Sequence, residues 1–160
     1  MFKLKKVFHK KNNQCELKIF NLEHISKTKI IKMYNKIILL MNLKDKSFFG
    51  TIMVNDVSKH LQGLSKINEH IIVGTYEESK NIFRYELEFK GEFIIILLDY
   101  ILMNDLTLYM FQNETNNHCS DIELLLNDRD CWSLSFNENL YDSNLIYKAI
   151  EKIKNDLCKE

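Results

Sequence analysis

One apolar stretch limits the structures that this chain can form: residues 93–112, FIIILLDYILMNDLTLYMFQ. A transmembrane helix needs about 20 consecutive apolar residues with few or no charges. The longest unbroken apolar run here is residues 93–98, and Asp99, Asn104 and Asp105 interrupt the remainder of the stretch. A carboxylate near the middle of a bilayer costs about 3 kcal/mol or more. The stretch therefore predicts part of a folded core, and we expect no membrane span.

The residues around the start of this stretch favour a β-sheet. Residues 82–90 alternate between a mostly charged side and an apolar side, and this period of two is typical of a half-buried strand. The run after Gly91 is apolar on both faces, as in a strand covered on both sides. After a turn near Asn104 and Asp105, residues 106–112 predict another strand. We therefore expect two strands within 93–112. A buried helix over Phe93–Met103 is the alternative, because periodicity alone does not separate the two.

Other segments predict further strands and three helices. The strands are expected at residues 2–8 and 15–20, joined by a hairpin loop, and at 70–76, 121–126 and 131–136. One helix is expected over 22–44 after Asn21 as its N-cap, and a second over 56–67 with Asp56 as its cap. A third, over 142–157, has Asp142 or Ser143 as its cap. Its apolar stripe contains Leu145, Ile146, Ala149, Ile150, Ile153 and Leu157.

The order of these elements predicts an α+β fold: a largely antiparallel sheet with two to three helices packed on one face. The chain has 160 residues, which fits one domain over residues 1–160. No internal repeat and no linker rich in Gly or Ser divides it.

Cysteine usage and the N-terminal segment favour a reduced, cytoplasmic protein. The four cysteines, at 15, 119, 131 and 158, include no C-x-x-C pair and form no pattern typical of a secreted disulfide framework. The first 14 residues have the lysines of a signal peptide but lack the apolar segment that should come after them.

The net charge is zero, but the charges are divided unevenly along the chain. Residues 1–50 carry 12 lysines and 3 acids, which gives 12 − 3 = +9. The remaining residues carry 10 basic and 19 acidic side chains, which gives 10 − 19 = −9. Such asymmetry is a sign of a charged partner. The alternative is that folding mixes the two halves, because segment charge does not fix position in the fold.

The sequence contains no catalytic signature. The four glycines are isolated, which excludes a phosphate-binding loop, and the five histidines lack the spacing of a zinc hydrolase. His118, Cys119 and Cys131 are conceivable metal ligands, but no fourth ligand accompanies them and their spacing does not fit a zinc finger. We therefore expect no cofactor and no metal.

One short pattern has a mechanism behind it: Glu88-Phe89-Lys90. An acid and a lysine two apart on a strand point the same way, where they can hold Mg²⁺ and polarise an attacking water. The pattern resembles the E-x-K strands of the restriction-endonuclease-like nucleases. That resemblance covers three residues, and only Asp56 is a remote candidate for the further acid that such a site needs. A metal-dependent nuclease using Glu88 and Lys90 is the alternative function.

The lysine-rich N-terminal third suggests a second alternative, a nucleic-acid-binding module. Lysines can neutralise phosphates and exposed aromatic rings can stack on bases. Arginine, which groove-reading proteins favour, occurs only at positions 84 and 129, so nucleic acid is not the partner that we expect. The residues concerned are Lys3, Lys5, Lys6, Lys10, Lys11 and Lys18, with Phe2, Phe8 and Phe20 nearby.

The segment from residue 114 to residue 142 is strongly acidic. It carries seven acids against a single basic residue, Arg129. An acidic surface can recognise a basic protein quickly and specifically. Trp132 and Tyr141 lie among these charges and are candidates for aromatic anchors. The expected partner-binding residues are Glu114, Asp121, Glu123, Asp128, Asp130, Trp132 and Tyr141, with Glu138 and Asp142 completing the acids.

The late strands DIELLLNDRDCWSLSF and the helix SNLIYKAIEKIKNDL resemble bacterial immunity proteins that neutralise polymorphic toxins, such as those of contact-dependent growth inhibition systems. The resemblance covers about a quarter of the chain and includes no diagnostic motif. It implies a stoichiometric inhibitor that binds a cognate toxin and blocks its active site or its approach to substrate. If the toxin is a basic nuclease, the acidic surface would stand in for the phosphates of nucleic acid. The sequence indicates nothing about oligomeric state.

Overall fold

A computed structural model describes the chain except residues 1–2, 10–12, 21–24, 113–119, 128–130 and 160. It confirms the α+β class, with eight strands and four α-helices among the described residues, one helix more than the expected two to three. The elements are β1 (Lys3–His9), β2 (Gln14–Phe20), α1 (Lys27–Leu40), β3 (Ser47–Val54), α2 (Val57–Ile67), β4 (Ile72–Ser79), β5 (Ile82–Lys90), η3 (Gly91–Phe93), α3 (Ile94–Met103), β6 (Leu108–Gln112), β7 (Ile122–Leu126), β8 (Cys131–Asn137) and α4 (Ser143–Lys159).

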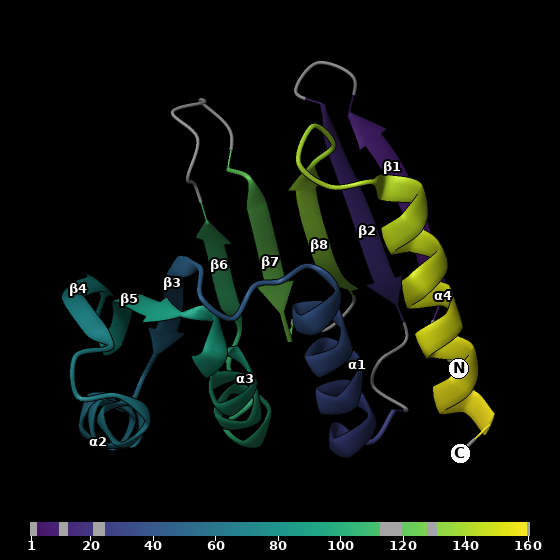
Figure 1. Ribbon diagram of the computed structural model, residues 1–160. Helices are drawn as coiled ribbons and strands as arrows, with labels where there is room; N and C mark the ends of the chain where they lie inside the picture. Colours follow the sequence, from purple (N-terminus) through teal and green to yellow (C-terminus); the bar gives the residue numbers. More distant parts are fainter. Residues whose placement is uncertain (1–2, 10–12, 21–24, 113–119, 128–130, 160) are drawn as a thin grey trace.

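The strands form one antiparallel sheet in the order β1-β2-β8-β7-β6-β3-β5-β4 (Figure 1). The N-terminal hairpin of β1 and β2 pairs with β8 near the end of the chain, so it lies at one edge of the sheet. The hairpin of β4 and β5 lies at the other edge, where β5 pairs with β3 and β4 is the edge strand. Strands that are neighbours in the sheet can therefore be far apart in the chain, as β2 and β8 are.

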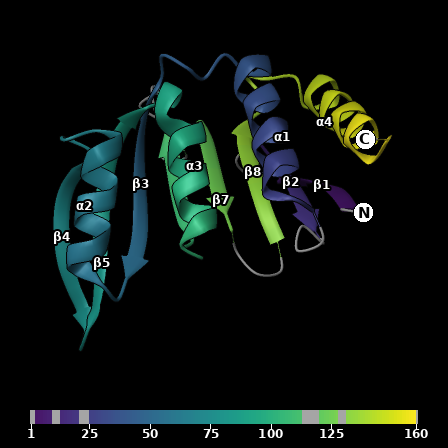
Figure 2. The ribbon, with the colours of Figure 1, turned by 90° about the horizontal axis from the view of Figure 1, so that it is seen from below.

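The helices form a layer on one face of the sheet, in the order α2, α3, α1, α4 (Figure 2). Side chains that face this layer are buried along each central strand, as in the alternation of buried and partly exposed positions in β2, β7 and β8. Tyr34 of α1 packs its ring on Trp132 of β8, with 5.2 Å between the ring centroids. The core is thus a single layer between the sheet and the helices. No helix in the described part of the chain is long and apolar enough to cross a membrane.

The structure corrects the expected strand after Gly91 and confirms the alternative, a buried helix. In α3 the side chains of Ile94, Leu97, Leu98 and Ile101 are buried, and their spacing is that of one helical face. Because α3 lies between α2 and α1 (Figure 2), its flanks are covered as well as its sheet-facing side. Because neighbours cover α3 on several sides, most of its positions are apolar. The sequence therefore lacks the contrast between an apolar and a polar face by which an amphipathic helix is detected.

One helix boundary and one strand also differ from expectation. The first helix begins at Lys27, with Ser26 as its N-cap, because the Ser26 hydroxyl accepts a hydrogen bond from the backbone N–H of Lys29 at 3.3 Å. The expected cap, Asn21, lies outside the described residues. Sequence reading also assigned no element to β3, which lies in the sheet between β6 and β5. The other strands and helices are confirmed, with shifts of a few residues at their ends.

Candidate partner-binding face

The face of the sheet opposite the helices, here called the open face, carries a group of apolar and aromatic side chains. Strand pairing places them side by side: Phe49 opposes Phe111, and Tyr109 lies between Thr51 and Leu125. Met53 lies further along the same face of β3. We name this group the aromatic patch, and it consists of Phe49, Met53, Tyr109, Phe111 and Leu125.

The rings of the aromatic patch pack on one another while remaining accessible. The centroids of Phe49 and Phe111 are 5.7 Å apart with an angle of 29° between the rings, and those of Tyr109 and Phe111 are 6.0 Å apart. Phe49 is 43% exposed, Met53 45% and Tyr109 39%. Contiguous apolar surface of this kind on a folded protein is typical of an interaction site.

Carboxylates flank the aromatic patch on both sides. On β5, Glu88 opposes Phe49 and Glu86 opposes Thr51. On β7, Glu123 opposes Phe111, and it is hydrogen-bonded to the hydroxyl of Tyr109. Burial, followed by the charge and hydrogen bond of Glu123, raises the pKa of Tyr109 above its ordinary value, which keeps the phenol protonated as the donor.

Arg84 adds a positive charge to this region, but acids hold its guanidinium. Nη1 lies 2.9 Å from a carboxylate oxygen of Glu78, and Nη2 lies 3.6 Å from one of Glu86. The guanidinium also lies over the ring of Tyr76, 5.0 Å from its centroid. Near the patch the open face therefore presents mainly aromatic rings and carboxylates.

The opposite end of the open face is basic. Lys3 and Lys5 of β1 and Lys18 of β2 lie on this side of the sheet, and Lys18 makes a 3.7 Å ion pair with Glu16. Lys6 lies on the other side and donates to the side chain of Asn144 at 2.9 Å. Phe8 is on that same side, while Lys10, Lys11 and Phe2 lie outside the described residues. Folding therefore does not fully mix the charges: the open face runs from basic at β1 and β2 to acidic at β7 and β5.

Only some of the expected partner-binding residues lie at the surface. Trp132 is 3% exposed and Asp121 is 1% exposed, so neither presents a side chain to a partner. Tyr141 packs on Phe136, with 6.0 Å between ring centroids. Glu123 lies on the open face beside the aromatic patch. Glu114, Asp128 and Asp130 lie outside the described residues.

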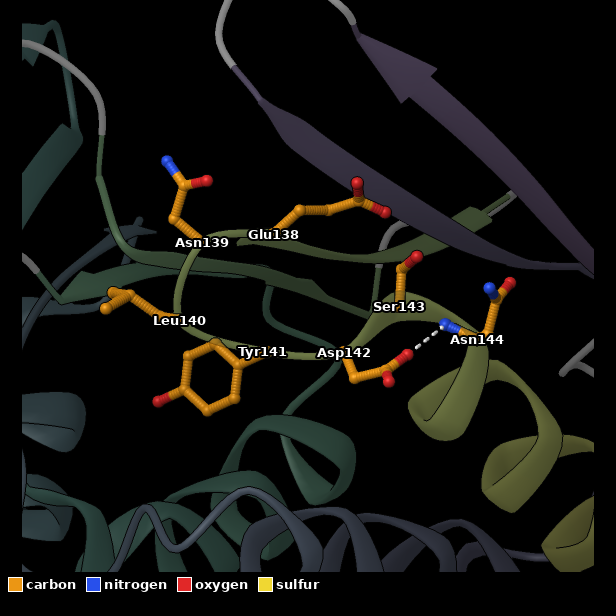
Figure 3. A pocket seen from close by; sticks show the side chains of 7 residues that line it. All are labelled: Glu138, Asn139, Leu140, Tyr141, Asp142, Ser143 and Asn144. Atoms are coloured by element: carbon orange, nitrogen blue, oxygen red, sulfur yellow. Dashed lines mark hydrogen bonds between the residues drawn. The ribbon is translucent and has the colours of Figure 1, made fainter.

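The loop between β8 and α4 surrounds a separate, shallow hollow of about 380 Å³ (Figure 3). In Figure 3, Glu138 and Asn139 point to one side of the loop, and Leu140 and Tyr141 point to the other. Asp142, one of the two expected caps, is the N-cap of α4. Its Oδ1 accepts hydrogen bonds from the backbone N–H of Asn144 at 3.0 Å and of Leu145 at 3.1 Å. The carboxylate of Asp142 is therefore already used in starting the helix.

Glu88 and Lys90 lie on the open face, beside a hollow of about 400 Å³ that His70 and Phe93 also line. The ammonium of Lys90 donates to the hydroxyl of Ser47 at 2.9 Å. Asp56 caps α2 beyond the far end of β3, so it does not join Glu88. In the described part of the chain, no three His, Cys, Asp or Glu side chains are grouped to hold a metal ion. His118 and Cys119 lie outside that part.

Sequence reading missed the aromatic patch because its centre includes β3, the strand that was not assigned. Within SFFGTIMV both faces carry apolar residues, so alternation does not reveal which of them face the core.

Comparisons of the chain with protein-family models, with curated proteins and with solved structures gave no match.

Proposed function

We propose that this chain is an immunity protein that binds a toxin protein and neutralises it, with the open face of its sheet as the binding surface. The observation that carries the proposal is the aromatic patch, left uncovered on the face opposite the helices. Aromatic residues and Met are enriched where proteins bind one another, and buried aromatic anchors provide much of the binding energy. The resemblance of the late strands and last helix to immunity proteins supplies the class of partner.

Charge defines the expected partner more closely. Glu88 and Glu123 lie on opposite sides of the patch, so a basic surface fits it better than an acidic one. A toxin that acts on nucleic acid has such a surface at its active site, because it must hold phosphates. Binding there would cover the site and exclude the substrate.

The test is co-expression with the product of the adjacent upstream gene, with affinity capture and growth as the two readouts. We expect a one-to-one complex and relief of growth inhibition. Changing Phe49 and Tyr109 together to Ser should weaken the complex roughly 30-fold or more, the effect of losing about 2 kcal/mol at a binding hot spot. Glu123→Lys should slow association and make it less sensitive to salt.

The matched control replaces two equally apolar side chains on the helix layer. Leu39 is 61% exposed on α1 and Leu145 is 59% exposed on α4. Changing both to Ser should leave the affinity of the complex unchanged. A complex that resists the Phe49 and Tyr109 changes but is lost in the helix-layer variant would refute the open face as the binding surface. Absence of both complex and growth relief would refute the inhibitor function.

A further inference from the structure

A small hollow borders the aromatic patch at the start of β6. It has a volume of about 340 Å³ and lies between β3 and the turn that leads from α3 into β6. Met53 and Tyr109 of the aromatic patch form its apolar wall, and Thr51, which opposes Tyr109 across the strand pair and precedes Met53 on the same face of β3, also lines it. The rest of the lining comes from the turn, namely Asp105, Leu106 and Thr107. We name it the anchor hollow.

Hydrogen bonds hold the turn that lines the anchor hollow. The hydroxyl of Thr107 donates to the backbone carbonyl of Asn127 at 3.2 Å, and the side-chain amide of Asn127 donates to the carbonyl of Leu106 at 2.6 Å. The N–H of Leu106 donates in turn to the carbonyl of Ile101 at 3.0 Å. The phenol of Tyr109 is held by Glu123. A hollow fixed in this way binds without first being ordered, which favours affinity.

The chemistry of the lining suits a planar cation on an apolar stem. Asp105 is exposed and makes no ion pair with any described residue, so its carboxylate is available. The wall of Met53 and Tyr109 can pack against methylene groups, and the ring of Tyr109 attracts a cation over its face. A guanidinium combines stacking on a ring with paired hydrogen bonds to a carboxylate, which an ammonium does not.

We propose that the anchor hollow receives an arginine side chain of the partner protein. Its methylene stem lies against Met53, its guanidinium stacks on Tyr109, and Asp105 accepts its hydrogen bonds. The identity of the partner rests on the proposed function, but the recognition of arginine can be measured without the partner.

The experiment uses N-acetylarginine amide as the probe and the full chain labelled for NMR. We expect shifts of the Met53 methyl group and of the backbone amides of Thr51 and Thr107 as the probe is added. N-acetylcitrulline amide, which has the same shape without the charge, should cause much smaller shifts. Asp105→Asn should weaken binding of the arginine probe by roughly fivefold, the effect of one exposed ion pair. Asn tolerates the left-handed backbone of this position, where φ is 51°, so the variant should remain folded.

Asp99→Asn is the matched control, because Asp99 is an exposed acid on α3 that does not line the hollow. It should leave probe binding unchanged. A lysine probe, Nα-acetyllysine amide, keeps the charge without the planar guanidinium. If the citrulline or the lysine probe binds as tightly as the arginine probe, or if the arginine probe causes no shift at Met53, the assignment is overturned. Loss of the toxin complex with retained arginine binding would reject the proposed function and leave the anchor hollow standing. A toxin complex that forms without any binding of the arginine probe would reject the anchor hollow and leave the proposed function standing.

Discussion

His60 of α2 packs against α3 and is only 4% exposed. Its Nδ1 is 2.6 Å from the hydroxyl oxygen of Tyr100, and the two rings meet edge to face with centroids 5.9 Å apart. Burial lowers the pKa of His60 below its ordinary value of 6.5; the charge of Lys59 adds to this effect and that of Asp56 opposes it. The folded protein therefore favours the neutral imidazole.

This preference predicts a pH dependence of stability. Above the unfolded-state pKa, which is about 6.5, both states hold His60 neutral and its contribution is complete. As the pH falls below that value the unfolded state takes up the proton first, so the free energy of unfolding decreases. Urea unfolding between about pH 5 and pH 7 should show this slope. His60→Gln should flatten it, whereas Tyr100→Phe should keep most of it, because burial is the largest cause. An unchanged slope in His60→Gln would contradict the prediction.

Gly91 allows a close approach between two segments of backbone. Its N–H donates to the carbonyl of Lys46 at 2.8 Å, and an added Cβ would overlap the backbone carbonyl of Leu43. Gly91→Ala should therefore lower the free energy of unfolding by about 1–3 kcal/mol, as overpacking does. In Gly74→Ala the added Cβ would meet only the exposed ring of Tyr76, which can move away, so the loss should be below about 1 kcal/mol. Denaturant unfolding of the two variants makes the comparison, and equal losses would contradict it.

Among elements, α3 gives the sharpest test of packing. Leu97 is fully buried, whereas its neighbour Ile96 is 53% exposed. Leu97→Ala should lower the free energy of unfolding by about 2–5 kcal/mol, because it leaves a cavity. Ile96→Ala should lower it by about 0.5 kcal/mol or less. Large losses at both positions would indicate that both faces of the segment are buried, as in the strand that the sequence suggested.

The elements that sequence reading found are those with one solvent-exposed face and one buried face. The alternation in residues 82–90 and the stripe of the last helix are visible because water and core impose different residues on the two sides. The segment that became α3 is covered on several sides, and β3 carries apolar residues on both faces, so neither shows a period. For the same reason the aromatic patch was not predicted. Trp132 was a different case: it was taken for a surface anchor because acids surround it in the sequence, although β8 alternates and Trp132 packs on Tyr34 in the core.

At the scale of the whole molecule, the two edges of the sheet are protected against further strands. Strand β1 carries Lys3, Lys5 and Lys6, and the pairing of β4 with β5 is shifted twice, with exposed Glu77 and Glu78 on β4. Charged side chains and bulges on edge strands discourage pairing with another chain. A partner is therefore better received on the open face than at either edge, in agreement with the proposed binding surface.

One core cluster joins residues from both ends of the sheet, which predicts that the chain unfolds as a unit. Trp132, the single tryptophan, reports on β8, whereas circular dichroism reports on all the helices. The urea transitions followed by the two signals should coincide. Leu64→Ala, on α2 at the far end of the sheet, should shift both equally by about 2–5 kcal/mol, because Leu64 is fully buried. A shift in the helix signal alone would show that the end formed by β3, β5, β4 and α2 unfolds separately from the end that holds Trp132.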